Sequence, residues 1–234
     1  MNAPHPLHGT PPWGPALPVH TVVLAKAPLP GRAKTRLAPA LGADGAARLA
    51  SLLLHDALAR VQAACAAPGG AGPQSAELCS APGPGHADWA AELPHGPHPG
   101  QPHWSWTDQG DGDLGQRMGR ASQRVTASGR AVLLVGTDCP TLSPTLLNEA
   151  ARQLQRHDAV LLPATDGGYV LLGLRQHVPQ LFEHMPWSTA DVADLTRARV
   201  HALGLSLWQG VPLQDVDELA DMAHLPLFLC SQLF

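Results

Sequence analysis

The sequence predicts a single α/β domain in which helices pack over a mostly parallel central sheet. Its 234 residues are 44% apolar, which is enough for one sizeable hydrophobic core. Short apolar runs, AVLLV at 131–135 and AVLLP at 159–163, are typical of strands that are buried on both faces. Segments with helical spacing of apolar residues lie between such runs, and this alternation implies parallel pairing.

The first predicted unit is a strand, a loop and a helix. The β-branched run VHTVVLA at 19–25 predicts a buried strand, which the prolines and glycine of the next segment end. Asp44 is the predicted N-cap of a helix that extends to about Cys65, because leucines follow it at helical spacing.

Capping residues and breakers place the later elements. Asp113 and Ser143 are predicted N-caps, Pro144 occupies a first helical position, and Pro226 stops the last predicted helix. The further predicted strands lie at 76–80, 104–107, 131–135, 159–163, 169–174 and 205–208. The further predicted helical segments lie at 88–93, 113–125, 144–156, 188–203 and 218–225.

Composition excludes several functional classes. Only 15% of the residues are charged and the formal net charge is -4, so the chain lacks the basic stripe that a nucleic-acid partner requires. No apolar run approaches the ~18 residues of a membrane span, and the N-terminal segment does not resemble a signal peptide. Four scattered cysteines predict free thiols rather than disulfides or structural zinc. We therefore expect a cytoplasmic protein.

The chain begins with a segment of different composition. Residues 1–18 are rich in proline and have little to bury, which predicts a disordered tail. Residues 19–234 then form the predicted domain. No internal repeat is visible within it.

Three aspartates are candidate metal ligands. Asp138 directly follows the run AVLLV, so its carboxylate is expected at the carboxyl end of a strand, where open α/β sheets bind their ligands. Asp215 and Asp217 alternate and would point the same way in an extended segment. Carboxylate oxygens suit Mg²⁺ or Mn²⁺. The alternative is that these residues only cap helices or form turns.

A basic loop follows the first predicted strand. Lys26, Lys34 and Arg36 surround it, Gly31 permits close approach of the backbone, and Thr35 supplies a hydroxyl. The pattern indicates phosphate binding, although it lacks the glycines of a Walker A loop. A solvated basic surface is the alternative.

Two further loops are candidates for ligand contact. Asp166, Gly167 and Gly168 follow a predicted strand, in a pattern that fits either a backbone amide nest or an ordinary hairpin turn. Arg117 and the helix N-terminus near it would attract an anion, unless Arg117 is simply solvated. The histidines between 86 and 103 lack the spacing of metal ligands, and Trp187 with Ser188 and Thr189 is interpreted as the start of a helix.

Taken in order, these motifs resemble one family. They comprise KAPLPGRAKTRL at 26–37, Gln109 with GDLGQRM at 112–118, GTDCP at 136–140, DGGY at 166–169, WST at 187–189 and DVD at 215–217. The chain is similar to the DUF2064 family, also called rSAM/selenodomain-associated transferase 1. That family belongs to the glycosyltransferase A (GT-A) superfamily and is similar to 2-phospholactate and molybdenum cofactor guanylyltransferases.

The resemblance implies a Rossmann-like GT-A fold with three layers, an NTP or NDP-sugar bound over the strand ends, and a divalent cation. Its metal aspartates correspond to Asp138, Asp215 and Asp217, and its phosphate-facing residues to Lys34 and Arg36. The resemblance also implies that the nucleotide contacts Gln109, Arg117 and the loops that contain Gly31, Gly167 and Gly168.

Three functions are compatible with these residues. The first is nucleotidyl transfer, in which a small anionic acceptor attacks the α-phosphorus of an NTP while Lys34 and Arg36 balance the charge of the pyrophosphate and Asp138 holds the metal. The second is glycosyl transfer from an NDP-sugar, with Asp166 as base. The third is a nucleotide-binding scaffold without turnover, because a fold alone does not establish activity.

Overall fold

A single sheet forms the centre of the molecule. The computed structural model describes residues 16–67, 72–98, 100–101 and 103–233. Its 7-stranded sheet has the order β3-β2-β1-β4-β6-β5-β7. The strands are β1 (Val19–Lys26), β2 (Ser75–Ala81), β3 (Trp104–Asp108), β4 (Ala131–Val135), β5 (Ala159–Pro163), β6 (Tyr169–Leu174) and β7 (Leu207–Gln209). The predicted α/β class and mostly parallel sheet are confirmed.

One strand departs from the parallel pattern. β6 pairs antiparallel with both β4 and β5, whereas the other described pairs are parallel. The alternating pattern of strand and helix predicted parallel pairing for β5, which does pair parallel with β7, but β6 lies between β4 and β5 and forms a hairpin with β5. A short Asp-Gly connection permits only this antiparallel return.

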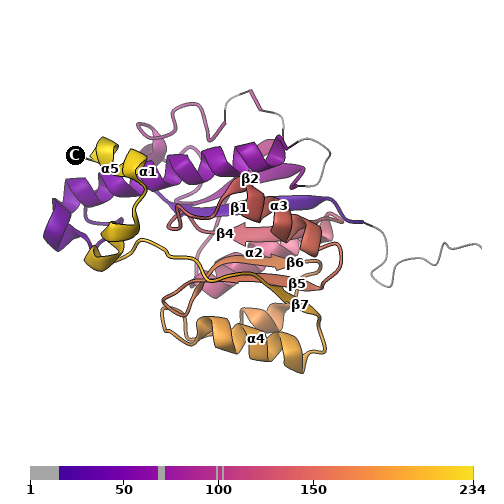
Figure 1. Cartoon of the computed structure of the whole chain (residues 1–234). Helices are drawn as coiled ribbons and strands as arrows, with labels where there is room; N and C mark the ends of the chain where they lie inside the picture. The colour runs from indigo at the N-terminus through magenta and orange to yellow at the C-terminus, as the bar shows by residue number, and fades with distance from the viewer. Residues whose placement is uncertain (1–15, 68–71, 99, 102, 234) are drawn as a thin grey trace, which may run out of the picture.

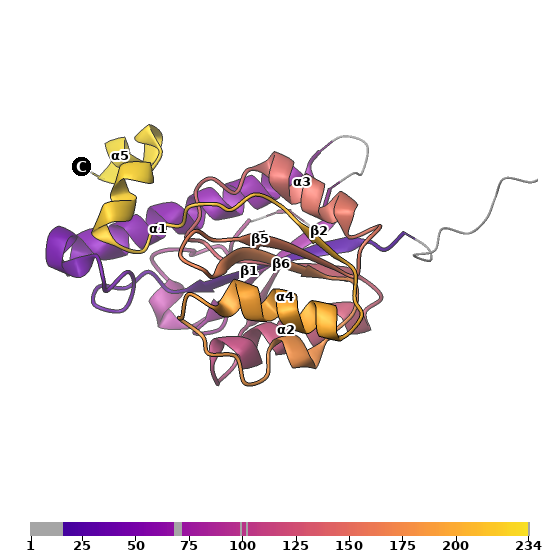
Figure 2. The ribbon, with the colours of Figure 1, turned by 60° about the horizontal axis from the view of Figure 1, so that its bottom comes forward.

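Helices cover both faces of the sheet and make three layers (Figures 1 and 2). α1 (Ala38–Cys65) and α3 (Pro144–Gln153) pack on one face, whereas α2 (Leu114–Ala127) and α4 (Val192–Ala202) pack on the other. α5 (Leu227–Leu233) packs beside the N-terminal part of α1. Successive side chains of β4 enter opposite cores, which explains why AVLLV is apolar throughout.

The predicted caps of α2 and α3 are confirmed. The Asp113 side chain accepts from Gln116 N at 2.8 Å, and Gln116 Oε1 accepts from Asp113 N at 2.9 Å. This reciprocal arrangement is a capping box. Ser143 Oγ accepts from Leu146 N at 3.3 Å, with Pro144 at the first helical position.

Other helix boundaries differ from the prediction. α1 begins at Ala38, but Gly42 interrupts it with a φ of 73°, so the regular helix starts close to the predicted Asp44. α4 begins at Val192 rather than at Ser188, because Ser188 has a φ of 66°, which no right-handed helix contains. A short 3-10 helix, Leu219–His224, ends before Pro226, and α5 follows that proline. The sequence did not predict α5.

The last residues of the predicted tail, 16–18, belong to the described part of the chain. Residues 1–15 lie outside the described residues, but Leu17 N donates to Gln155 Oε1 at 3.0 Å and Pro18 O accepts from Ala131 N at 2.8 Å. The four cysteines are free thiols, as predicted. In the His-rich segment, the ring of His98 packs against Trp104 at an interplanar angle of 43°, with ring centroids 4.5 Å apart, and its Nε2 lies 3.2 Å from Leu58 O.

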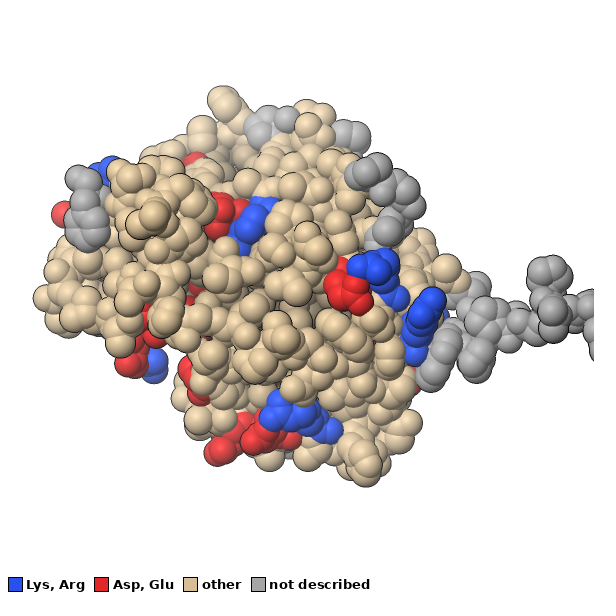
Figure 3. Space-filling view, viewed as in Figure 1, with Lys and Arg blue, Asp and Glu red and all other residues tan. Residues whose placement is uncertain are grey.

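The surface carries few charges on the face that Figure 3 shows, and its Lys and Arg side chains form no continuous stripe. Within the described parts of the chain, no helix has the length and apolar character of a membrane span.

Gly173 in β6 permits close packing of α3 on the sheet. A Cβ at this position would lie 2.4 Å from Val160, 2.7 Å from Leu133 and 3.0 Å from Leu154. Gly173→Ala is therefore expected to lower the free energy of unfolding by about 1–3 kcal/mol, measured by denaturant titration. Gly136→Ala is the control, since a Cβ there meets no heavy atom within 4 Å. Equal stability of the two variants would contradict this packing constraint.

Candidate active site

A cavity of about 810 Å³ lies at the carboxyl ends of β1, β4 and β5. The strand order reverses next to β1, and open α/β sheets bind ligands at such a reversal. The cavity wall includes the loop after β1, the loop after β4, the hairpin between β5 and β6, and residues 215 and 217. A smaller hollow of about 400 Å³ beside α2 contains none of the predicted site residues.

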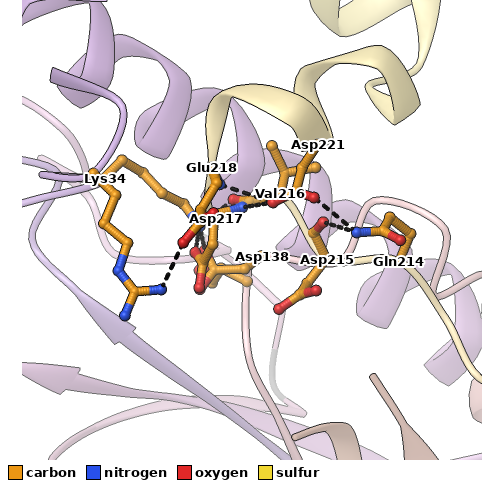
Figure 4. Close-up of polar contacts among 10 residues, drawn as sticks. Lys34, Asp138, Gln214, Asp215, Val216, Asp217, Glu218 and Asp221 are labelled. Carbon is orange, nitrogen blue, oxygen red and sulfur yellow. Dashed lines mark hydrogen bonds and ion pairs between the residues drawn. The ribbon is translucent and has the colours of Figure 1, made fainter. Parts of the chain in front are cut away.

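Lys34 lies at the centre of the polar contacts in this cavity (Figure 4). Its Nζ is 2.6 Å from Asp138 Oδ1 and 2.6 Å from Asp217 Oδ1, and it donates to Val216 O at 2.6 Å. The three ammonium protons therefore all have acceptors. The Lys34 side chain is only 6% exposed, whereas those of Asp138 and Asp217 are 46% and 42% exposed.

The electrostatic balance favours the charged form of Lys34. Burial by itself lowers the pKa of its ammonium group, but attraction to Asp138 and Asp217 outweighs burial and raises that pKa above the ordinary value. The backbone of Lys34 has a φ of 47°, an unusual left-handed conformation for a residue with a side chain. The side-chain contacts offset the strain of this conformation.

The segment that carries Asp215 and Asp217 is fixed by its neighbours. Val216 N donates to Asp138 O at 2.9 Å, which joins this segment to the loop after β4. The Asp221 carboxylate accepts from Asp217 N at 3.0 Å, Glu218 N at 2.8 Å and Gln214 Nε2 at 2.9 Å. Asp221 was missed in the sequence, although its spacing from Glu218 is that of a capping residue.

Asp215 lies in the same region as Asp138 and Asp217 (Figure 4). Burial, followed by repulsion from Asp166, Asp217 and Asp138, raises its pKa to about 6. Asp215 therefore holds its proton more tightly in the folded protein than in the unfolded chain.

The carboxylates fit a divalent cation in part. Among the described residues, no group of three or more Asp, Glu, His or Cys side chains is arranged to hold a metal ion. However, Asp138 and Asp217 both contact Lys34 Nζ and keep exposed side-chain area in the cavity. Mg²⁺ is commonly held by one or two carboxylates, with phosphate and water completing its shell. The residues fit such a site rather than a preformed cage of three carboxylates.

The basic residues of the cavity all come from one short stretch. Lys26, Arg32, Lys34 and Arg36 line the wall, with Thr35 between the last two. The Arg36 side chain is 63% exposed and lies 3.4 Å from Glu218 Oε1. The Arg32 side chain is 73% exposed and lies 3.2 Å from Asp88 Oδ2. These exposed guanidinium groups are available to an anion in the cavity.

The hairpin between β5 and β6 presents Asp166 to the cavity. Asp166 Oδ1 accepts from Gly168 N at 2.8 Å, and both residues line the wall. Gly167 does not line it. Its φ is 91°, and a Cβ there would lie 2.0 Å from Ala190 O, so Gly167 is needed for packing against the chain before α4.

Gln109 joins the ends of β1 and β2. Its Nε2 donates to Ala25 O at 2.9 Å and to Cys79 O at 2.8 Å, and its Oε1 accepts from Arg117 Nη1 at 3.2 Å. Gln109 is 4% exposed, so it positions the cavity wall. Arg117 also donates to Gly112 O and does not line the cavity.

An aromatic region forms another part of the wall. Tyr169 and Trp187 pack edge to face with ring centroids 6.4 Å apart, and Met118 and Leu114 lie beside them on the wall. Burial raises the pKa of the Tyr169 hydroxyl, which therefore stays protonated. The predicted helix start at Trp187 is wrong, and this side chain lines the cavity instead.

Arg60 is a further residue that sequence reasoning missed. It extends from α1 and donates to Cys139 O at 2.6 Å and Leu142 O at 3.0 Å, while Asp56 pairs with it at 2.9 Å. Arg60 thereby holds the loop that carries Asp138. Its position four residues after Asp56 resembles an ordinary helix ion pair, so the sequence held no signal of this role.

The structure thus brings most of the predicted site residues to one cavity. These are Lys26, Lys34, Thr35, Arg36, Gln109, Asp138, Asp166, Gly168, Asp215 and Asp217. Gly31, Arg117 and Gly167 do not line it.

Comparisons with known proteins agree with this fold. A family model described as "Uncharacterized protein conserved in bacteria (DUF2064)" matches residues 64–189. A protein of Desulfovibrio desulfuricans G20, described as a candidate nucleotide-diphospho-sugar transferase, is 31% identical over 87% of this chain and 84% of its own, with a TM-score of 0.73. No curated protein matches the chain.

More distant structures share the fold alone. The 4-diphosphocytidyl-2C-methyl-D-erythritol synthase of Anaerococcus prevotii DSM 20548 is 10% identical, with a TM-score of 0.56 over 92% of this chain and 100% of its own. A CMP:2-keto-3-deoxy-manno-octonic acid synthetase in complex with CTP is 11% identical, with a TM-score of 0.54 over 92% and 99%.

The raised pKa of Asp215 makes stability depend on pH. A folded-state pKa above the ordinary value favours folding at low pH, and this contribution is lost as the pH rises through about 6. Asp215→Asn is therefore expected to raise the free energy of unfolding by about 1 kcal/mol near pH 8. This is less than the full pKa shift corresponds to, because solvent partly screens the charges.

This gain in the free energy of unfolding should shrink as the pH is lowered toward about 5. Denaturant titrations near pH 8 and near pH 5 measure the difference. Asp191→Asn, at an exposed position, is the matched control. A gain for Asp215→Asn that does not change with pH would argue against a raised pKa at this position.

Proposed function

Since this chain belongs to the DUF2064 family, we propose that it is a metal-dependent transferase that uses a nucleotide, and that it joins an NMP to a small acceptor with release of pyrophosphate. The observation that carries the proposal is the meeting of a basic loop and an aspartate cluster in one cavity at the strand ends. Such a pairing suits a polyphosphate with its cation.

The exposed cations of the loop bind the phosphates in this proposal. Arg36 and Arg32 present guanidinium groups, and Lys26 and the Thr35 hydroxyl lie on the same wall. Arginine matches phosphate oxygens with paired N–H donors. These groups offset the negative charge that develops on the departing pyrophosphate.

In this proposal Asp138 and Asp217 would hold the metal, with Asp215 close to both. When bound, Mg²⁺ or Mn²⁺ supplies positive charge to the phosphates. The carboxylates position it, and Asp221 and Arg60 fix the two segments that carry them.

The acceptor occupies the aromatic region beside Tyr169 and Trp187. An acceptor oxygen forms a bond to the α-phosphorus, and the bond from that phosphorus to the bridging oxygen of the pyrophosphate breaks. For a hydroxyl acceptor, Asp166 takes the proton, since its carboxylate faces the cavity. The cations of the wall all belong to the basic loop, so the anionic acceptor predicted from the sequence would share those residues with the nucleotide.

Glycosyl transfer from an NDP-sugar is the second candidate. The description of the Desulfovibrio desulfuricans protein as a candidate nucleotide-diphospho-sugar transferase favours it. In that reaction the basic loop holds the diphosphate as leaving group, and Asp166 removes a proton from the acceptor.

Product analysis separates the two reactions. Incubation with Mg²⁺, each NTP and a panel of small acids and alcohols is expected to release pyrophosphate, detected by a coupled phosphate assay. Release of free NDP from an NDP-sugar would instead support glycosyl transfer. Nucleotide binding without either product would contradict both reactions and indicate a scaffold.

Asp138→Asn tests the metal assignment. The amide keeps the shape of the side chain but loses the charge that holds a hard cation. We expect the Mg²⁺-dependent part of nucleotide affinity to fall by about 100-fold in isothermal titration, with little change in melting temperature. Asp191→Asn serves as the control. Unchanged Mg²⁺ dependence in Asp138→Asn would exclude Asp138 as a ligand.

A further inference from the structure

Lys34 has the contacts of a fixed structural cation rather than of a ligand-binding side chain. Its ammonium group has three acceptors at 2.6 Å, namely Asp138 Oδ1, Asp217 Oδ1 and Val216 O. Lysine has three N–H donors, so none remains for a phosphate oxygen. Its side chain is 6% exposed.

The carboxylates lie between Lys34 and the solvent. All three residues line the cavity, but the side chains of Asp138 and Asp217 are 46% and 42% exposed, whereas that of Lys34 is 6% exposed. A cation can therefore approach the exposed part of both carboxylates without displacing Lys34. The exposed side chains of Arg32 and Arg36 remain available for phosphate.

We propose that Lys34 is a positioning residue that stays beneath Asp138 and Asp217 throughout the reaction, holding both carboxylates for a divalent cation while Arg36 and its exposed neighbours contact the phosphates. This inference rests on the proposed nucleotide and cation site. It assigns to Lys34 a role different from the phosphate contact that the motif implies.

Moving Lys34 to a phosphate would break all three of its contacts. The ammonium would have to give up two charge-assisted hydrogen bonds to Asp138 and Asp217 and a third hydrogen bond to Val216 O. The backbone of Lys34 is left-handed, with a φ of 47°. Val216, whose carbonyl Lys34 also binds, is itself joined to Asp138 through its N–H.

Lysine acylation tests whether Lys34 stays in place. Lys26 and Lys34 are the lysines of this chain, and Lys26 is exposed on the same cavity wall. A brief pulse of acetic anhydride followed by peptide mass spectrometry is expected to modify Lys26 and leave Lys34 protected in the free protein. The same protection of Lys34 is expected with Mg²⁺ alone and with Mg²⁺ and ATP or GTP.

Two results of the pulse would overturn the proposal. Acylation of Lys34 on addition of Mg²⁺ would mean that the cation displaces it. Acylation of Lys34 in the free protein and protection only by nucleotide would mean that it contacts phosphate directly. The acylation pulse does not depend on turnover. If the protein shows no transferase activity but Lys34 stays protected in all three conditions, the proposed function is refuted and the positioning role of Lys34 is not.

A pair of variants separates positioning from phosphate binding. Lys34→Met is expected to keep nucleotide affinity in EDTA and to lose about tenfold of the additional affinity that Mg²⁺ provides, as for other residues that orient a metal ligand. Arg36→Met is expected to lose affinity in both conditions. Melting temperatures confirm that each variant is folded.

Loss of affinity in EDTA by Lys34→Met, equal to that of Arg36→Met, would overturn the proposal. If Lys34→Met does not fold, the acylation pulse on the unaltered chain still decides the matter.

Discussion

The candidate site depends on one ammonium group held between two carboxylates. Lys34 joins three segments that are distant in the chain: the loop after β1, the loop after β4 and the segment before the last 3-10 helix. Without this cation, Asp138 and Asp217 would repel each other, together with Asp215 and Asp166. Burial, followed by repulsion from Asp166, Asp217 and Asp138, raises the pKa of Asp215 even with this cation present. In the proposed function, the aspartate cluster would hold a divalent cation, and the exposed arginines beside it would contact the phosphates that accompany such a cation.

Secondary interactions keep this arrangement rigid. Arg60 fixes the loop of Asp138 from α1, Asp221 fixes the segment of Asp217, and Gln109 joins the ends of β1 and β2. These residues bond mainly to backbone groups, so they set where each loop lies. The site is therefore built at the strand ends of the sheet, with its loops held by these hydrogen bonds.

Much of the fold could be predicted because its signals are local. The buried strands are apolar throughout, and the caps Asp113 and Ser143 form contacts within one helical turn. The predictions failed where long-range packing decides the backbone. Ser188 adopts a φ of 66° and delays α4, and β6 inserts between β4 and β5 although the chain pattern implies parallel neighbours. α5 was missed because Pro226, interpreted as a stop, also precedes a new helix.

The sequence by itself determined the fold class, the family and the set of polar residues at the strand ends, because strand periodicity, capping and ordered motifs are properties of neighbouring residues. Only the tertiary structure decided what each of those residues contacts. The motif of Lys34 predicted a phosphate ligand. Its ammonium group instead forms ion pairs with Asp138 and Asp217, which lie 104 and 183 positions away in the chain. Gly167 likewise looked open to a ligand and is instead packed on Ala190. Such contacts join distant parts of the chain, and no local pattern of residues specifies them.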